Sequence, residues 1–166
     1  MLRTLQTARI QSSGGRSFAI VASRYNERYV NAMLRAAQAV LRKARVRKVE
    51  VIRVPGAYEI PVVAATLARQ RSPSFSAIIC LGVIFRGETT HAKHIAEAVS
   101  QSLAHAQVMF GVPIIHGIFL FESEEQAKVR CLGRKHNRGA EAAHTALEMA
   151  EVLDRIRPSR AVKNAL

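Results

Sequence analysis

The stretch Gly82 to His91, with the sequence GVIFRGETTH, differs by one residue from a phosphate-binding P-loop. A P-loop has the pattern G-x-x-x-x-G-K-[S/T], in which the lysine reaches the distal phosphates and the hydroxyl holds magnesium. Here Glu88 stands in place of that lysine. The segment therefore predicts a turn between a strand and a helix that binds an anion other than a nucleoside triphosphate.

Thr89, Thr90 and the unpaired N–H groups of the following helix would form this anion site. The helix dipole and the hydroxyl donors favour negative charge at the same place, and one phosphate monoester suits the site. His91 lies in the first turn of the helix, where an imidazole can transfer protons near neutral pH. Taken alone, Thr90 is explained equally well as a simple N-cap.

The segment SRYN follows the first apolar run and places an aromatic ring beside an amide. The ring of Tyr25 can stack on a flat ligand, and the amide of Asn26 can hydrogen-bond the ligand's edge. Taken alone, the two residues are better explained as a rim tyrosine and a helix N-cap. Their position directly after a strand keeps them as candidates for ring binding.

The segment VPGAYEIP follows the second apolar run, and its proline and glycine predict a tight turn. Such a turn lets the backbone of Ala57 and Tyr58 come close to a ligand. Glu59 opens the next helix, where its charge can also serve the helix dipole alone. The segment is thus a second candidate wall of a binding site.

The chain is strongly basic, because 25 Lys and Arg residues against 12 Asp and Glu residues give a formal net charge of +13. Such a charge indicates nucleic acid, an acidic surface or an anionic ligand. The basic clusters at residues 42–48 and at the C-terminus are best explained as solvated surface. The cluster between residues 126 and 140 contains no acid, and its Arg130 offers a planar fork for phosphate oxygens. A solvated face would also explain this third cluster.

The elements that must position these groups alternate between strands and helices, as in a parallel α/β fold. Near-continuous apolar runs predict four strands that are covered on both faces, at residues 18–22, 49–54, 77–84 and 112–121. The last helix is expected to begin near Asn137 and to stop at Pro158. Right-handed crossovers place the carboxyl ends of all four strands at one edge, where the candidate segments would meet.

The 166 residues, 49% of them hydrophobic, fit a single domain. No apolar run reaches the roughly 20 residues that span a bilayer, so no membrane contact is expected. Cys80 and Cys131 show no spacing typical of a metal site or a disulfide framework, which predicts free thiols in a reducing, cytoplasmic setting and no bound metal.

Residues 1–16 form a separate segment in this interpretation. Residues 1–26 contain arginines and serines without an acid, a composition that organelle transit peptides share. An N-terminal arm that docks on a neighbouring subunit explains this composition at least as well. Residues 17–158 are expected to form the domain, and residues 159–166 a basic tail.

Three blocks of the sequence, RVPGAYEIPV, GVIFRGETTH and HNRGAEAAHTALEMA, together resemble the lumazine synthase family of riboflavin biosynthesis. The resemblance extends from about Ser17 to Val152. It implies a flavodoxin-like three-layer α/β sandwich with a four-stranded parallel sheet, and an N-terminal arm that adds to the sheet of a neighbouring subunit. It also implies pentamers, which pair into decamers or close into sixty-subunit shells, with each active site between two subunits.

The reaction implied by the resemblance is the condensation of 5-amino-6-ribitylaminouracil with 3,4-dihydroxy-2-butanone 4-phosphate. The products are 6,7-dimethyl-8-ribityllumazine, phosphate and water, and no cofactor is needed. Riboflavin synthase is an implied protein partner. Two other classes stay open: a flavin- or lumazine-binding protein without turnover, and a shell protein that binds nucleic acid. The last ranks lower, because the basic runs contain no interleaved aromatic residues.

Carried over by position, the resemblance assigns roles to thirteen residues. Tyr25 would stack on the pyrimidine, and His91 would be the proton shuttle. Glu88 and Thr89 would form the phosphate-binding turn. The pyrimidine and its ribityl chain would be lined by Asn26, Ala57, Tyr58, Glu59, Val83 and Ile84. The neighbouring subunit would supply His116, Arg130 and Arg138. Of these, Arg130 would be directed toward the phosphate.

The sequence departs from the family's pattern at several of these places. The family commonly has an aromatic residue where Ala92 and His116 stand, an acid at Lys93, and tryptophan or another residue at Tyr58. His116 can still stack as a ring, but a charged His116 would repel Arg130. The usual acidic partner of the proton shuttle is not placed by the sequence.

Overall fold

The computed structural model describes residues 15–70, 72, 74–133 and 136–156. All four predicted strands are present in one parallel sheet: β1 Ser17–Ser23, β2 Lys48–Val54, β3 Ala77–Phe85 and β4 Ile114–Phe121. Their order is β2-β1-β3-β4, which confirms the flavodoxin-like prediction. β4 begins two residues later than expected, because Pro113 has no N–H to donate to the ladder.

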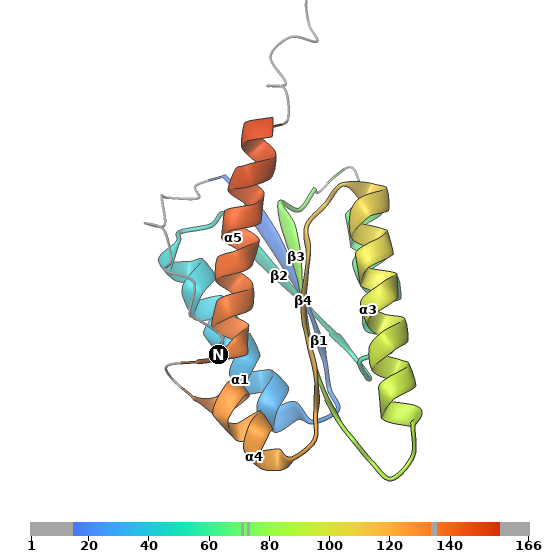
Figure 1. The fold of residues 1–166 in the computed structure, drawn as a ribbon. Helices are drawn as coiled ribbons and strands as arrows, with labels where there is room; N and C mark the ends of the chain where they lie inside the picture. The colour runs from blue at the N-terminus through green and yellow to red at the C-terminus, as the bar shows by residue number, and fades with distance from the viewer. Residues whose placement is uncertain (1–14, 71, 73, 134–135, 157–166) are drawn as a thin grey trace, which may run out of the picture.

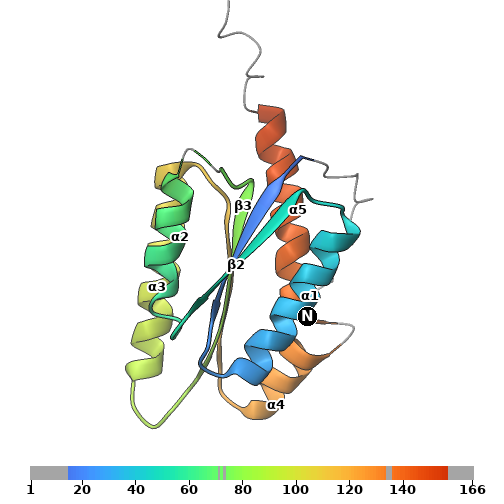
Figure 2. The ribbon, with the colours of Figure 1, turned by 180° about the vertical axis from the view of Figure 1, so that it is seen from behind.

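Helices cover both faces of the sheet and complete three layers (Figures 1 and 2). One face carries α1 Glu27–Lys43 and α5 Arg138–Ile156, and the other carries α2 Ile60–Arg69 and α3 His91–Phe110. The connection from β4 to α5 contains two short elements that the sequence did not predict, α4 Glu124–Ala127 and the π-helical η1 Lys128–Leu132. None of the helices in the described part of the chain is long and apolar enough to cross a membrane.

The sheet separates two apolar cores. Phe18 and Ile20 of β1 pack toward α1 and α5, whereas Ala19 and Val21 pack toward α2 and α3. This double burial explains the near-continuous apolar runs of the strands.

Asn137 fixes the start of α5 as an N-cap. Its Oδ1 accepts hydrogen bonds from the backbone N–H groups of Gly139 (2.9 Å) and Ala140 (3.4 Å). Its Nδ2 donates to the carbonyl of Cys131 (2.5 Å), which ties η1 to the same helix start. The predicted start of the last helix is therefore confirmed. Pro158, most of the N-terminal arm and the basic tail lie outside the described residues.

Candidate active site

A pocket of about 830 Å³ opens at the carboxyl ends of β1, β2 and β3, against the first turns of α3. This is the edge that the parallel topology singled out. Eight of the thirteen residues predicted for the site line it: Tyr25, Asn26, Ala57, Tyr58, Glu59, Val83, Ile84 and His91. The fold thus brings together four segments that are far apart in the sequence.

The turn after β1 is held to the two neighbouring strands. The backbone N–H of Tyr25 donates to the carbonyl of Pro55 (3.0 Å), and the amide Nδ2 of Asn26 donates to the carbonyl of Val83 (2.8 Å). Asn26 has a left-handed backbone conformation (φ 56°), and its side chain makes no capping bond to α1. Asn26 is therefore the N-cap residue of α1 by position, but its amide braces the floor of the pocket instead of capping the helix.

The turn after β2 is stabilised by its own acid. The Oε2 of Glu59 accepts a hydrogen bond from the backbone N–H of Gly56 (2.8 Å). Gly56 also lies against the ring of Tyr25, since an added Cβ would come within 3.0 Å of ring atom Cδ2. Ala57 is buried, while 63% of Tyr58 is exposed at the rim. Close packing at a glycine thus aligns the tyrosine ring with the second turn of the site.

The RGETTH segment joins β3 to α3 as an open turn with exposed Glu88, Thr89 and Thr90. Thr90 precedes the helix but makes no side-chain capping bond. Thr89 Oγ1 accepts a weak hydrogen bond from the backbone N–H of His91 (3.4 Å). Thr90 is therefore the N-cap of α3 by position only, and its hydroxyl makes no bond to the start of this long helix.

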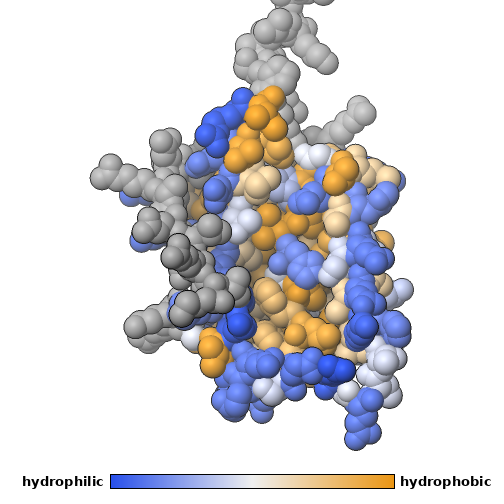
Figure 3. All heavy atoms as spheres, viewed as in Figure 1, coloured by the Kyte–Doolittle hydropathy of each residue, from blue (hydrophilic) through white to orange (hydrophobic). Residues whose placement is uncertain are grey.

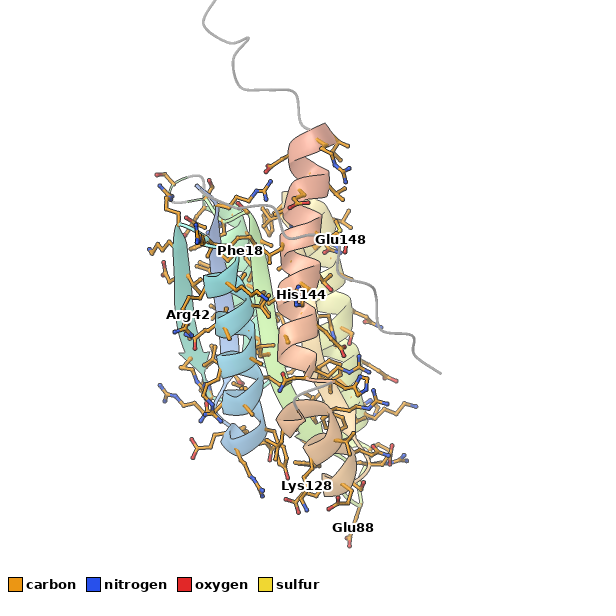
Figure 4. All side chains as sticks on the ribbon, turned by 90° about the vertical axis from the view of Figure 1, so that its left-hand side faces the viewer. Phe18, Arg42, Glu88, Lys128, His144 and Glu148 are labelled. Carbon is orange, nitrogen blue, oxygen red and sulfur yellow. The ribbon has the colours of Figure 1, made fainter. Side chains whose placement is uncertain are left out.

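The cations that flank this turn already have acidic partners. Arg86 Nη1 lies 3.0 Å from Glu122 Oε1, and Lys93 Nζ lies 3.7 Å from Glu97 Oε1. Figure 4 shows Glu88 at the same end of the molecule as Lys128, beyond the ends of the strands. The chain's own neighbouring cations are thus engaged rather than directed at the turn.

The three residues expected from a neighbouring subunit do not line the main pocket of their own chain. His116 and Arg138 instead line a groove of about 440 Å³ along the edge strand β4, and Arg130 lies half-buried on η1. The guanidinium of Arg138 pairs with Glu141 and lies 5.7 Å from the ring centroid of Phe119. This separation is what a site divided between two subunits requires.

His116 is held by a hydroxyl on α3. Its Nε2 lies 2.9 Å from Ser100 Oγ, which itself donates to the carbonyl of Ala96 (2.7 Å). Because the serine proton is used in that second bond, Nε2 carries the proton and donates to the serine. Burial lowers the pKa of His116 below its ordinary value. The neutral ring is favoured, which reduces the repulsion of Arg130 that a charged ring would cause.

Comparison with known proteins places the chain in a family. The family model described as 6,7-dimethyl-8-ribityllumazine synthase matches residues 15–154. The chain belongs to the lumazine synthase family. This membership confirms the reaction, the enzyme class and the fold that the sequence predicted: the chain is a transferase of riboflavin biosynthesis that forms 6,7-dimethyl-8-ribityllumazine.

Individual lumazine synthases from distant organisms align over most of the chain. The enzyme of Stenotrophomonas maltophilia is 38% identical over 157 residues, which cover 93% of this chain and 95% of the relative. The enzyme of Thermococcus onnurineus is 40% identical over 142 residues, covering 86% and 91%. The chloroplastic enzyme of Arabidopsis thaliana is 41% identical over 142 residues, covering 84% of this chain and 62% of the relative.

Sequence reasoning missed part of the pocket's helical wall in this lumazine synthase. His94, Ile95 and Ala98 of α3 line the pocket together with His91 and Ala92. The prediction considered residues that directly follow strands, whereas these residues lie one and two turns into a helix. Their spacing of three, four and seven residues from the first histidine was the available signal, because such positions share one helix face.

Both cysteines of this family member are buried and free. Burial raises the pKa of Cys131 to about 11 and that of Cys80 further. Within the described residues, no group of three or more His, Cys, Asp or Glu side chains is arranged to hold a metal ion. The described cysteines are thus structural core residues and carry no chemistry here.

Proposed function

We propose that the 830 Å³ pocket is the active site in which 5-amino-6-ribitylaminouracil condenses with 3,4-dihydroxy-2-butanone 4-phosphate. The observation that carries this proposal is the convergence on one pocket of eight residues predicted from the sequence. Its volume falls within the range of about 300 to 1,000 Å³ that is typical of small-molecule sites. Its position at the carboxyl edge of a parallel sheet is where such folds bind ligands.

The pyrimidine is proposed to stack on Tyr25, a residue that is 70% exposed and whose ring lies beside Gly56. Because the amide nitrogen of Asn26 is engaged by β3, its oxygen is left to accept a hydrogen bond from the pyrimidine. The backbone of Ala57 and Tyr58 completes the edge of the ring site. The ribityl chain then lies along the wall that includes Val83.

The phosphate of the second substrate is proposed to bind Thr89 and the N-terminus of α3, beside Glu88. A single phosphate needs a further cation, and the flanking Arg86 and Lys93 are already paired. Arg130 of a neighbouring copy would supply a forked guanidinium. His116 and Arg138 of that copy would close the same site.

This division of the site requires an oligomer, for which we propose the pentamer, with decamers and sixty-subunit shells as larger forms. Figure 3 shows apolar residues between α5 and α3, over the edge strand β4. The groove there is lined by Ile114, Ile115, Phe119 and Met149 among others. An apolar surface around an open strand edge is suited to contact with another subunit.

In the proposed reaction the amine of the pyrimidine attacks the ketone to form an imine, phosphate leaves, and the ribitylamino nitrogen closes the second ring. Holding two reactants together supplies much of the rate. Proton transfer by His91 contributes a further factor of about 10² to 10⁴. No cofactor is assigned to any step.

The setting of the enzyme completes the proposal. Two buried free thiols are typical of a reducing compartment, so we assign the chain to the cytoplasm. Residues 1–16 are proposed as the arm, 17–158 as the domain and 159–166 as the tail. Riboflavin synthase is proposed as a protein partner.

The proposal is tested by incubating the purified full-length chain with both substrates and following lumazine formation by absorbance. We expect turnover well above the reaction in buffer, and none when either substrate is omitted. Replacement of Tyr25 by alanine should slow lumazine formation. Equilibrium binding of riboflavin by a chain that forms no lumazine would instead indicate a binding protein without catalysis.

A further inference from the structure

The pocket contains a second histidine that the reaction scheme has not used. His91 and His94 both line it, three residues apart on α3. Residues with this spacing lie one turn apart on the same helix face, with Cβ atoms about 5 to 6 Å from each other. Both residues are exposed, and neither ring hydrogen-bonds to a residue that the structure describes. Both imidazoles are therefore available to a bound substrate.

Among the residues that the structure describes, the pocket around His94 holds no unbonded acid that would compete as a proton carrier. Lys93 stands where the family commonly has an acid, and it pairs with Glu97 outside the pocket. Among the described residues that line the pocket, Glu59 is the acidic one, and its Oε2 is bound to the N–H of Gly56. Ala92 is a small pocket residue on the same wall. The two imidazoles are thus the groups best suited to move protons near neutral pH.

The two histidines differ in their distance from the phosphate-binding turn. His91 directly follows Thr89 and Thr90, whereas His94 lies one turn further along α3. A butanone whose phosphate occupied the turn would place its phosphate-bearing carbon nearer the first histidine. The carbonyl carbon, two bonds further along the substrate, would then lie nearer the second histidine.

We propose that His94 is a second catalytic residue, which carries the proton during imine formation, while His91 serves the later release of phosphate. This inference rests on the assignment of the pocket as the active site. It gives the two proton-transfer tasks of the reaction to two different groups. The substrate class that His94 would contact is a ketone being attacked by an aromatic amine.

The step balances without any further reactant. The amine nitrogen forms a bond to the carbonyl carbon, the π electrons move to oxygen, and His94 takes the nitrogen proton and returns it to that oxygen. His94 then takes the remaining N–H proton, and the resulting imidazolium donates it to the carbinolamine hydroxyl. The hydroxyl leaves as water while the nitrogen electrons form the C=N bond. One water is released, and His94 ends as it began.

The test compares His94→Gln with His105→Gln in the purified full-length enzyme. His105 is a matched control, because it is an exposed histidine of the same helix that lies outside the pocket. Glutamine keeps hydrogen bonding but cannot shuttle a proton in this way. We expect kcat of His94→Gln to fall by about 10²-fold, the lower end for such a group, with both KM values within a few-fold of the original. His105→Gln should match the unchanged enzyme.

Two further readouts separate proton transfer from a structural effect. Added imidazole should restore part of kcat to His94→Ala and none to a His105→Ala control, and His94→Gln should alter the pH profile of kcat. Thermal unfolding establishes that each variant is folded, and His94→Asn replaces any variant that is not. Unchanged kcat in the folded His94 variants, or a change confined to KM, would overturn the inference.

The outcome also distinguishes this inference from the assignment of the site. If Tyr25→Ala and His91→Gln are impaired while His94→Gln is not, only the catalytic role of His94 is rejected, and the assignment of the pocket as the active site stands. If all three behave like the unchanged enzyme, the pocket is not the active site.

Discussion

Tyr25 is 70% exposed in the single chain, although its ring is held by close contact with Gly56. An ordered aromatic ring that faces open space beside a pocket is suited to stacking on a flat ligand. Its neighbour Asn26 instead uses its amide to join β1 and β3. The proposed site therefore depends on two neighbouring residues: the exposed ring of Tyr25 and the hydrogen-bonded amide of Asn26.

Replacing Tyr25 by alanine should weaken binding of the pyrimidine substrate. By analogy with nucleobases that stack on aromatic side chains, we expect a loss of about 1 to 3 kcal/mol. Equilibrium binding of 5-amino-6-ribitylaminouracil measures this loss directly. Tyr25→Phe should retain the affinity of the unchanged enzyme. If Tyr25→Ala also retained it, the ring of Tyr25 would not bind the pyrimidine by stacking.

Replacing Arg130 by alanine should raise KM for the butanone phosphate, with a loss of roughly 1.5 to 3 kcal/mol that is typical of a hydrogen bond to a charged group. KM for the pyrimidine should change little. Steady-state kinetics with each substrate varied in turn separates the two effects. Lys128→Ala is the matched control, because Lys128 belongs to the same basic cluster but pairs with Glu125 (2.6 Å). A weaker pyrimidine site in Arg130→Ala would contradict the assigned role.

The sequence predicted the site residues that directly follow strands, because a parallel sheet brings those positions to one edge. It could not predict the bond from Asn26 to Val83, whose partners are 57 residues apart. It also missed His94, which reaches the pocket through the helix face and not through the end of a strand. The distinction is physical, since topology groups the ends of strands and only packing decides which helix face turns toward them.

Helices α1 and α5 approach each other at a glycine. A Cβ built on Gly139 would lie 2.0 Å from the carbonyl oxygen of Met33, so no other residue fits there without a shift of the backbone. This contact orients the start of α5, where Arg138 stands. Strands and long helices were predictable from apolar periodicity. In contrast, α4 and η1 are too short to show a period, and distant contacts such as Tyr29 with Glu124 hold α4 in place.

Gly139→Ala should destabilise the fold by about 3 kcal/mol or more, because overpacking against backbone cannot be relieved by a rotamer change. Urea unfolding followed by circular dichroism measures the free energy. Gly87→Ala is the control, since an added Cβ there meets nothing within 4 Å, and its stability should stay within about 0.5 kcal/mol. Equal stability of the two variants would show that Gly139 of α5 does not lie as close to the backbone of Met33 in α1 as the structure has it.

The contact between Tyr29 and Glu124 should make stability depend on acid pH. The tyrosine hydroxyl donates to the carboxylate (2.5 Å), and this bond holds the pKa of Glu124 below its usual range. Because the pKa of Glu124 is lower in the folded state than in the unfolded state, where it is about 4.3, the ionised acid stabilises the fold at pH values above the unfolded pKa. This stabilisation is lost as the pH falls through the pKa of the folded state.

Tyr29→Phe removes this contribution, so its free energy of unfolding should be lower than that of the unchanged chain at pH 7. The difference should shrink as the pH falls toward 3. Urea unfolding of both proteins at several pH values measures it. A difference that stays constant over this range would show that the hydroxyl does not stabilise the ionised acid.

The whole molecule carries a formal charge of +13, yet Arg86 and Lys93 beside the proposed phosphate-binding turn are paired with acids. His116 and Arg138 face a groove on β4 that is separate from the main pocket. A single chain is therefore incomplete as a site for an anionic substrate. We expect the native mass, measured by mass spectrometry under non-denaturing conditions, to be five chains or a multiple of five. A native mass equal to one chain would contradict the proposal that two subunits share each active site.

The most direct test of a shared site is complementation between two impaired variants. One carries both Tyr25→Ala and His91→Ala, the other carries Arg130→Ala, and the two are coexpressed and assayed at a butanone phosphate concentration far below the KM of the Arg130 variant. In a randomly mixed ring, about a quarter of the boundaries join an intact pocket to an intact Arg130, because each half comes from a different subunit. We expect activity well above the mean of the two variants prepared separately. Activity equal to that mean would contradict this expectation, because each chain would then have to supply the complete site by itself.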